Sequence, residues 1–238
     1  MKNITLMMAY YNNPTMLAHH YKHWARYHDE VKAFVEIIIV DDGSKEAAMD
    51  VPRPAGLPPL RIYRVLEDRK WHQNGARNLA ASEATTDWLL MTDLDHVVPE
   101  GTFRTLKALA SPKCYYMFTR QDRNGALTLN KHGIAKPHPN TFAMTRELFM
   151  RLHGYDERTC GYYGTDRFFR RKLQASGAKE KTLAAKIIRY SREDIFDAST
   201  RDVERKDGRP RGWRNELNAR LEADPRPHFL MFPWRREL

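Results

Sequence analysis

The sequence predicts an α/β fold whose sheet is mainly parallel and carries helices on both faces. Apolar runs of strand length alternate with segments of helical periodicity along most of the 238-residue chain, which is typical of βαβ units. The runs are rich in β-branched residues, as strands buried on both faces are. Two of them end in acidic residues, and such sheets bind ligands beyond the carboxyl ends of their strands.

The first half of the chain follows this alternation. Residues 3–11 and the β-branched run 35–40 predict buried strands, and the proline-rich stretch 51–59 predicts a surface connection. Pro14 begins a helix between the two strands. Its apolar face is predicted to carry Leu17, Tyr21, Trp24 and His28.

A second group of elements repeats the pattern. Residues 60–66 and 87–93 predict strands, and the alanine-rich segment 74–84 predicts a helix that begins near Gly75. Residues 101–110 predict a further helix. Its apolar face comprises Phe103, Leu106 and Leu109.

The pattern then changes. Residues 114–130 predict two strands joined by a turn at Asn124 and Gly125. A short helix follows, capped by Thr145 and closed by Gly154.

The last elements divide the chain into two parts. A helix over 165–175 and a buried strand over 184–190 complete a predicted domain of residues 1–190. Residues 191–238 predict an arginine-rich extension that could cover an acceptor site, mediate dimerisation or touch a membrane surface. Its aromatic residues include Trp213, Phe229, Phe232 and Trp234.

Composition narrows the class of protein. Hydrophobic residues make up 42% and charged residues 29% of the chain, as in globular proteins. No apolar stretch is long enough to span a bilayer, and the N-terminus lacks a signal-peptide pattern, so we expect a cytoplasmic protein and leave peripheral membrane contact open. Cys114 and Cys160 form no CxxC pair and are expected to be free thiols.

The net charge of +10 is unevenly distributed. Residues 146–190 hold eleven Lys/Arg and five Asp/Glu, whereas residues 191–238 hold eleven and ten. A basic surplus attracts the phosphates of nucleotides, lipids or nucleic acids, although a solvated face has the same composition. A nucleic-acid-associated protein is therefore an alternative at this point.

Two motifs lie at predicted turns. Asp41 and Asp42 end the second strand before Gly43, where they could accept hydrogen bonds from a ligand or cap a surface turn. The segment 74–78 places Arg77 beside a helix start, which suits a diphosphate and equally suits a capped helix with a surface arginine.

Asp93 and Asp95 follow the strand 87–93 as the pattern DxD. Magnesium and manganese ions take carboxylate ligands together with substrate phosphates. If the backbone stays extended, the two carboxylates point to the same side. A DxD pattern alone is often accidental, but its position at a strand end favours a ligand site.

The stretch from 155 to 172 provides further candidate groups. Asp166 lies in the first turn of a predicted helix, where the helix dipole favours its charge. Asp156 and Glu157 precede it, and several arginines follow it. The tyrosines of this stretch could form a platform for a sugar ring, although buried packing also explains them.

Together these segments resemble the family 2 type of nucleotide-sugar glycosyltransferases, which have the GT-A fold. The resemblance runs from Ile4 to Tyr190 and comprises the motifs VDDGS, GARN, DLD and GYDE followed by GTD. The last segment is similar to the C-terminal part of galactosyltransferase and polypeptide N-acetylgalactosaminyltransferase domains. The resemblance implies a GT-A type, Rossmann-like fold.

The resemblance also implies roles for individual residues. Asp41 and Asp42 would contact the nucleotide base, and Arg77 would approach the diphosphate. Asp93 would contact ribose or the metal. Asp95 would bind the metal, which would be Mn²⁺ or Mg²⁺.

Asp166 would be the catalytic base, and the resemblance implies inversion at the anomeric carbon. Two positions depart from the family pattern. Thr165 replaces the usual Glu, and residues 189–191 lack the late metal-binding histidine. His96 could substitute for that histidine, or the ion could arrive with the donor.

The expected function is therefore transfer of a hexose from a nucleotide-sugar, most simply a UDP-sugar, to an unknown acceptor hydroxyl. A transferase acting on a polyanionic acceptor, such as modified DNA or a phosphorylated glycolipid, is a second alternative beside the nucleic-acid-associated protein.

Overall fold

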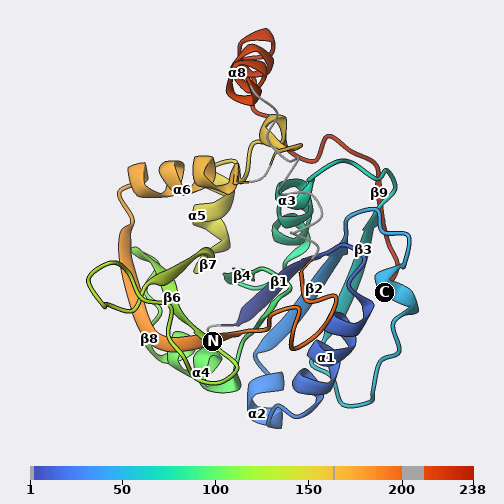
Figure 1. The fold of residues 1–238 in the computed structure, drawn as a ribbon, viewed down its shortest axis with the longest axis vertical. Coiled ribbons are helices and arrows are strands. Elements are labelled where there is room, and N and C mark those ends of the chain that lie inside the picture. The colour runs from blue at the N-terminus through green and yellow to red at the C-terminus, as the bar shows by residue number, and fades with distance from the viewer. Residues whose placement is uncertain (1–2, 163, 200–211) are drawn as a thin grey trace.

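The computed structural model describes residues 3–162, 164–199 and 212–238. Within these ranges nine strands form one sheet in the order β5-β8-β6-β7-β4-β1-β2-β3-β9 (Figure 1). The strands are β1 Ile4–Tyr10, β2 Val35–Asp41, β3 Leu60–Val65, β4 Trp88–Thr92, β5 His96–Val97, β6 Cys114–Asp122, β7 Pro137–Thr145, β8 Lys179–Arg189 and β9 Trp234–Arg236.

The centre of the sheet is parallel. β1 pairs in parallel with β2 and with β4, and β2 pairs in parallel with β3. β7 and β9 then join antiparallel to β4 and β3, and β5 joins antiparallel to β8. The α/β prediction is confirmed, and the sheet is mixed outside its parallel centre. The carboxyl ends of β1, β2, β3 and β4 meet at one edge.

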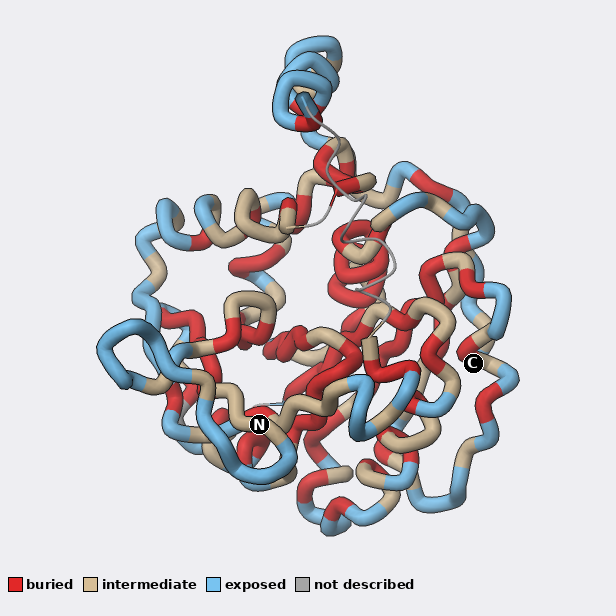
Figure 2. The backbone as a smooth tube through the Cα atoms, in the orientation of Figure 1, coloured by how far each residue is buried: buried red, intermediate tan, exposed pale blue. Residues whose placement is uncertain are grey.

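Helices cover both faces of the sheet, as expected. One apolar layer joins alternate residues of β1 and β2 to α1 and α4, and the other joins the intervening residues to α3, α5 and α6. The buried strands run through the middle of the molecule in Figure 2. The helices are α1 Pro14–Ala25, α2 Asp29–Lys32, α3 Gln73–Glu83, α4 Glu100–Leu109, α5 Arg146–Arg151, α6 Asp166–Ala175 and α8 Trp213–Ala223, with 3-10 turns η1 Ala48–Asp50 and η2 Glu157–Thr159.

Local details differ from expectation at a few places. α1 ends at Ala25, so His28 lies beyond it, caps α2 and pairs with Glu100 at 2.9 Å. α5 is capped by Thr145, whose Oγ1 accepts the Leu148 amide at 3.1 Å. Phe103 and Leu106 of α4 are buried, whereas the side chain of the third predicted residue of that face lies outside the described atoms.

The predicted hairpin over 114–130 is only half present. Its turn exists, because Gly125 has φ 87° and its amide reaches Asp122. The residues after the turn form only isolated bridges, however, and β6 pairs instead with β7. The loop between β6 and β7 is held by turns within itself. We name this loop, residues 123–136, the flap.

The C-terminal segment is built into the domain. Asp197 accepts the amides of Thr15 and Met16 at 2.7 and 2.9 Å and thereby caps α1. Phe232 packs in the second apolar layer, and β9 extends the sheet beside β3. The described part of residues 191–238 therefore packs against the predicted domain of residues 1–190 and extends its sheet.

Both cysteines are free and buried, as expected. No helix in the described part of the chain has the length and hydropathy that crossing a bilayer requires.

Candidate active site

A cavity of about 600 Å³ opens at the sheet edge where the parallel strands end, and we name it the main cavity. The segments that follow β1, β2, β3 and β4 form one side, and β6, the flap, β7 and the C-terminal segment form the other. It is lined by residues 9–13, Asp42, residues 69–73 and 93–95, Arg120, Thr128, residues 136–140, Ala198 and Ser199.

The segment 93–95 forms a tight turn at the floor of this cavity, in which the His96 amide donates to the Asp93 carbonyl at 3.1 Å. Tyr190 donates its amide to the Asp95 carbonyl at 2.8 Å, and the His20 ring lies 2.6 Å from the Leu94 carbonyl. The backbone is therefore not extended. The expectation that both carboxylates point to one side assumed an extended backbone, so the strand alternation does not apply here, although both residues line the main cavity.

The Asp93 carboxylate is a junction of several donors. Oδ1 accepts from Arg77 at 2.5 Å and from Gln73 at 2.8 Å, and Oδ2 accepts from Asn140 at 3.2 Å. Burial alone would raise the pKa of Asp93. Arg77, followed by His138, more than offsets this and lowers the pKa below its ordinary value, so Asp93 is a carboxylate at neutral pH.

Asp93, His96 and His138 offer ligand atoms that all lie within 4.8 Å of one another. β5 holds His96 by pairing it with Arg189, and His138 is the second residue of β7. The two imidazole rings lie 4.3 Å apart, centroid to centroid. Among the described residues this is the cluster that could hold a metal ion, and Asp95 lies outside it.

The donors of this cluster fit a divalent transition metal. The Thr141 hydroxyl lies 3.0 Å from His138 Nδ1, which leaves Nε2 toward Asp93. Burial, and then His96, lowers the pKa of His138 to about 2, so this ring is neutral as a metal ligand must be. His96 Nε2 is buried without a partner among the described atoms. One carboxylate with two imidazoles suits Mn²⁺ better than Mg²⁺.

Asp95 lies next to this cluster and contacts it through His96. Its Oδ1 is 2.6 Å from His96 Nδ1, although the contact lacks hydrogen-bond geometry. The predicted role of Asp95 as a metal ligand remains a prediction. Its carboxylate lies beside His96, one of the candidate ligands.

The two aspartates that end β2 have different surroundings. Asp41 is fully buried, and its oxygens accept the amides of Ser44 and Ala48 and the Arg64 guanidinium. Asp42 lines the main cavity and lies 3.0 Å from His72 Nδ1. Burial raises the pKa of Asp42 to about 6, although His72 opposes the shift. Of the two, Asp42 can meet a ligand, and Asp41 holds the turn.

The segment at the start of α3 is buried under the cavity. Arg77 is 1% exposed and is engaged with Asp93 and, at 3.4 Å, with the Tyr155 hydroxyl. Asn78 donates to Glu157 at 2.9 Å. The Arg77 guanidinium does not line the cavity and binds Asp93 instead. Its contact with a diphosphate stays a prediction.

Asp166 begins α6, as predicted, and lies close enough to Arg77 and Asp93 to feel their charges. Burial raises its pKa, and Arg77 opposes this shift. Asp166 is not among the residues that line the main cavity. A raised pKa in a carboxylate beside the site is the property that a general base requires.

Sequence reasoning missed His138 and Asn140. Both lie in KPHPNT, where neither residue repeats with a ligand spacing. The available signal was weak: a histidine between two prolines, with no partner nearby in the sequence.

A mixed sheet whose parallel centre ends in an acidic turn, with helices on both faces, is the GT-A glycosyltransferase fold. The glycosyl transferase family 2 model matches residues 5–174. The chain belongs to this family. A search of curated proteins finds no match.

Solved structures share this fold at low identity. TarS of S. aureus, residues 1–349, in complex with UDP-GlcNAc has 14% identity and a TM-score of 0.61, over 83% of this chain and 61% of that one. GalNAc-T7 with UDP, GalNAc and Mn²⁺ has 15% identity and a TM-score of 0.61, over 92% and 48%. The mannosyltransferase PcManGT of Pyrobaculum calidifontis with GDP-Man and Mn²⁺ has 18% identity and a TM-score of 0.60, over 91% and 68%. The chain thus spans less than two thirds of the first two proteins.

Proposed function

We propose that the chain transfers a hexose from a nucleoside-diphosphate sugar, most simply a UDP-sugar, to an acceptor hydroxyl. The observation that carries this proposal is the main cavity, which joins Asp42 at one strand end to the Asp93–His96–His138 cluster at another. Two of the three structural neighbours described above were solved with UDP or UDP-GlcNAc, and the third with GDP-Man.

The donor lies across the carboxyl ends of the parallel strands in this proposal. Asp42 accepts a hydrogen bond from the base, and the diphosphate lies toward the turn at 93–95. Arg69 and Lys70 line the same cavity and would stabilise phosphate charge.

Asp93, His96 and His138 would hold a divalent cation, with Asp95 orienting His96. The bound cation supplies Lewis-acid stabilisation of the charge that grows on the leaving diphosphate. The residues of the chain do the remaining work: Arg77 keeps Asp93 ionised, and Thr141 keeps the His138 ring in the orientation that exposes Nε2.

Asp166 is the proposed catalytic base. It removes the proton from the acceptor hydroxyl while that oxygen attacks the anomeric carbon from the face opposite the leaving diphosphate, so the configuration inverts. Burial raises its pKa, although Arg77 opposes the shift, and general-base catalysis of this kind contributes about 10²–10⁴-fold.

A polyanionic acceptor is the second candidate, and one observation favours it. Four cationic side chains line the main cavity, from the loop after β3, from β6 and from the flap: Arg69, Lys70, Arg120 and Lys136. A transferase whose acceptor bears phosphates would use such a rim, and high salt would weaken acceptor binding while donor binding persists.

The proposal is tested by thermal melting with UDP, GDP, CDP and dTDP, each with and without Mn²⁺. A ligand that binds only the folded state raises the Tm. We expect one nucleotide to raise the Tm only when Mn²⁺ is present, and His138→Gln to abolish this shift. Lys113→Gln, an exposed change outside the cavity, is the control. An unchanged Tm with every nucleotide would contradict the proposed donor site.

A further inference from the structure

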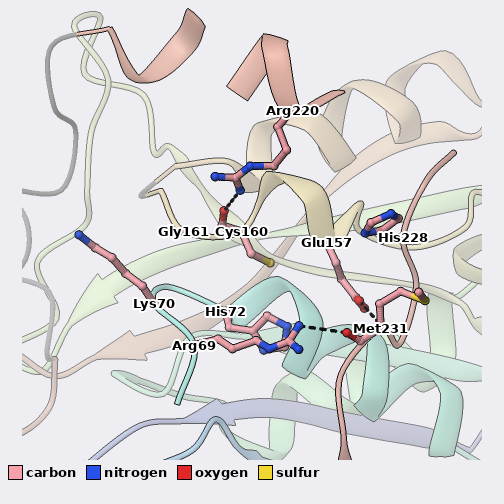
Figure 3. Close-up of a pocket in the computed structure, with 9 residues that line it drawn as sticks. All are labelled: Arg69, Lys70, His72, Glu157, Cys160, Gly161, Arg220, His228 and Met231. Carbon is pink, nitrogen blue, oxygen red and sulfur yellow. Dashed lines mark hydrogen bonds between the residues drawn. The ribbon is translucent and has the colours of Figure 1, made fainter. Parts of the chain in front are cut away.

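A second cavity of about 270 Å³ lies behind one wall of the main cavity. Arg69, Lys70 and His72 line both cavities and form the wall between them. On the far side, residues from η2, α8 and the segment 228–231 close around the space, as Figure 3 shows. This cavity is therefore assembled largely from the region beyond the parallel strands.

Cations dominate its lining. Arg220 reaches from α8 toward the cavity (Figure 3), and its Nη1 donates to the carbonyls of Arg158 and Cys160, each at 3.0 Å. Arg69 is partly engaged, with Glu67 at 2.6 Å. Within the described part of the chain, neither Lys70 nor Arg220 forms an ion pair with a carboxylate. Lys70 and Arg220 thus line this space without a carboxylate bound to either of them.

The carboxylate that lines the cavity is already satisfied. Glu157 Oε1 accepts from Asn78 at 2.9 Å and from the Leu230 amide at 2.7 Å, and Oε2 accepts from the Met231 amide at 2.9 Å. Its charge therefore fixes the C-terminal segment and is not directed at Lys70 or Arg220. The cavity keeps a positive excess.

One buried polar atom has no partner. His72 is 2% exposed, and its Nδ1 lies 3.0 Å from Asp42. Its Nε2, on the other edge of the ring, has no hydrogen-bond partner among the described atoms. This edge of the ring packs against α3, because a Cβ atom added at Gly75 would lie 2.2 Å from Nε2, so His72 is a fixed part of the wall.

The wall itself is strained at this point. Trp71, between Lys70 and His72, has φ 47°, a conformation that is unfavourable for a bulky side chain. Its carbonyl accepts the Gly161 amide at 3.3 Å, which ties the wall to the far side of the cavity. Strained backbone of this kind persists where the surroundings fix it, often at ligand clamps.

We propose that the second cavity binds a phosphate group, contacted by Arg220 and Lys70. The phosphate belongs either to the acceptor or to a free anion. The acceptor source rests on the proposed function, whereas the binding itself does not.

The test is calorimetric titration with inorganic phosphate in metal-free buffer that contains a chelator. We expect the wild type to bind and Arg220→Gln to weaken the affinity at least ten-fold. Arg220 lines only the second cavity, so this loss separates it from the main cavity. Arg151→Gln, at a 60% exposed arginine outside both cavities, is the matched control and should bind like the wild type.

Lys70→Gln is the second variant, because Arg220 also supports two carbonyls and its loss could disturb the fold. Lys70 is exposed, so its replacement should leave the Tm within a degree or so while it weakens phosphate binding. Absence of binding by the wild type, or undiminished affinity in both variants, would overturn the proposal.

Glycerol 3-phosphate distinguishes the two sources. Tighter binding than inorganic phosphate indicates that the cavity also recognises the carbon skeleton of a phosphorylated acceptor, whereas equal or weaker binding indicates a free phosphate. Nucleotide melting is measured in parallel. Phosphate binding without a nucleotide-dependent rise in Tm would contradict the proposed function and support the proposed phosphate site. A nucleotide-dependent rise in Tm without phosphate binding would support the proposed function and contradict the phosphate site.

Discussion

The two cavities share a wall but are built in different ways. The main cavity lies at the ends of paired strands, and its acidic groups are held by side chains such as Arg77 and Gln73. The second cavity lies between loops, α8 and the C-terminal segment, and its cation Arg220 is held by main-chain carbonyls. Carboxylates on a rigid sheet edge would suit a divalent cation. A basic site between loops suits an anion directly.

Replacement of Asp93 should give the largest effect. Asp93→Ala leaves Arg77, which is 1% exposed, without its carboxylate. Breaking a buried pair in this way costs about 3–5 kcal/mol. We expect the free energy of unfolding in urea to fall by this amount, and turnover to be lost. Asp95→Ala is the control and should cost clearly less. Equal losses would contradict the view that Asp93 is the structural junction of the main cavity.

Asp166→Asn tests the chemistry at the same edge. We expect kcat to fall about 10²–10⁴-fold because the proton acceptor is removed, while the nucleotide-dependent Tm shift stays unchanged. Asp29→Asn, at a fully exposed carboxylate, is the control. A Tm shift lost together with turnover would mean that Asp166 supports donor binding rather than proton transfer.

Asp42 lines the main cavity beside His72 and gives the free energy of unfolding a pH dependence. Its pKa in the folded protein is about 6, above the ordinary value of 3.8, so the folded state holds the proton more tightly than the unfolded chain. The free energy of unfolding should therefore fall as the pH rises from 4 to 6, by up to about 3 kcal/mol. Urea unfolding at several pH values measures this slope. Asp42→Asn should flatten it, and an unchanged slope would assign it to other groups.

Glu157→Gln tests how the second cavity is held together, because Glu157 binds the C-terminal segment that closes it. One amide N–H₂ of glutamine would face a main-chain N–H of Leu230 or Met231, which leaves a buried donor unsatisfied. The cost is about 1–3 kcal/mol, measured by urea unfolding. We also expect faster proteolysis after residue 223. Glu222→Gln, on the exposed face of α8, should change neither quantity.

The parts of the fold that local sequence encodes were predictable. β1, β2 and β4 are continuous apolar runs, and Asp42 and Asp93 follow their ends directly, so their meeting at one edge required only the parallel topology. The roles of the charged groups were harder to predict. Arg77 looked like a surface or phosphate-binding arginine, because nothing in its neighbourhood reveals that it is buried against Asp93.

The remainder depended on pairing between distant segments. His138 reaches the cluster only because β7 inserts antiparallel between β6 and β4, whereas the sequence favoured a hairpin closed at Asn124 and Gly125. β9 is three residues long and contains two arginines, which is no strand signal by itself. Its place beside β3 is fixed by the packing of Phe232 and by the bonds from Glu157.

The position of β9 has a consequence for self-association. A long apolar strand at the border of a sheet is a template on which another chain can add. β9 covers β3 with the short sequence Trp-Arg-Arg, and β5 at the other border is two residues long. The open flank of β8 carries Lys179, Glu180 and Lys181. Both borders are thus short or charged, so removal of β9 should expose β3 and increase aggregation.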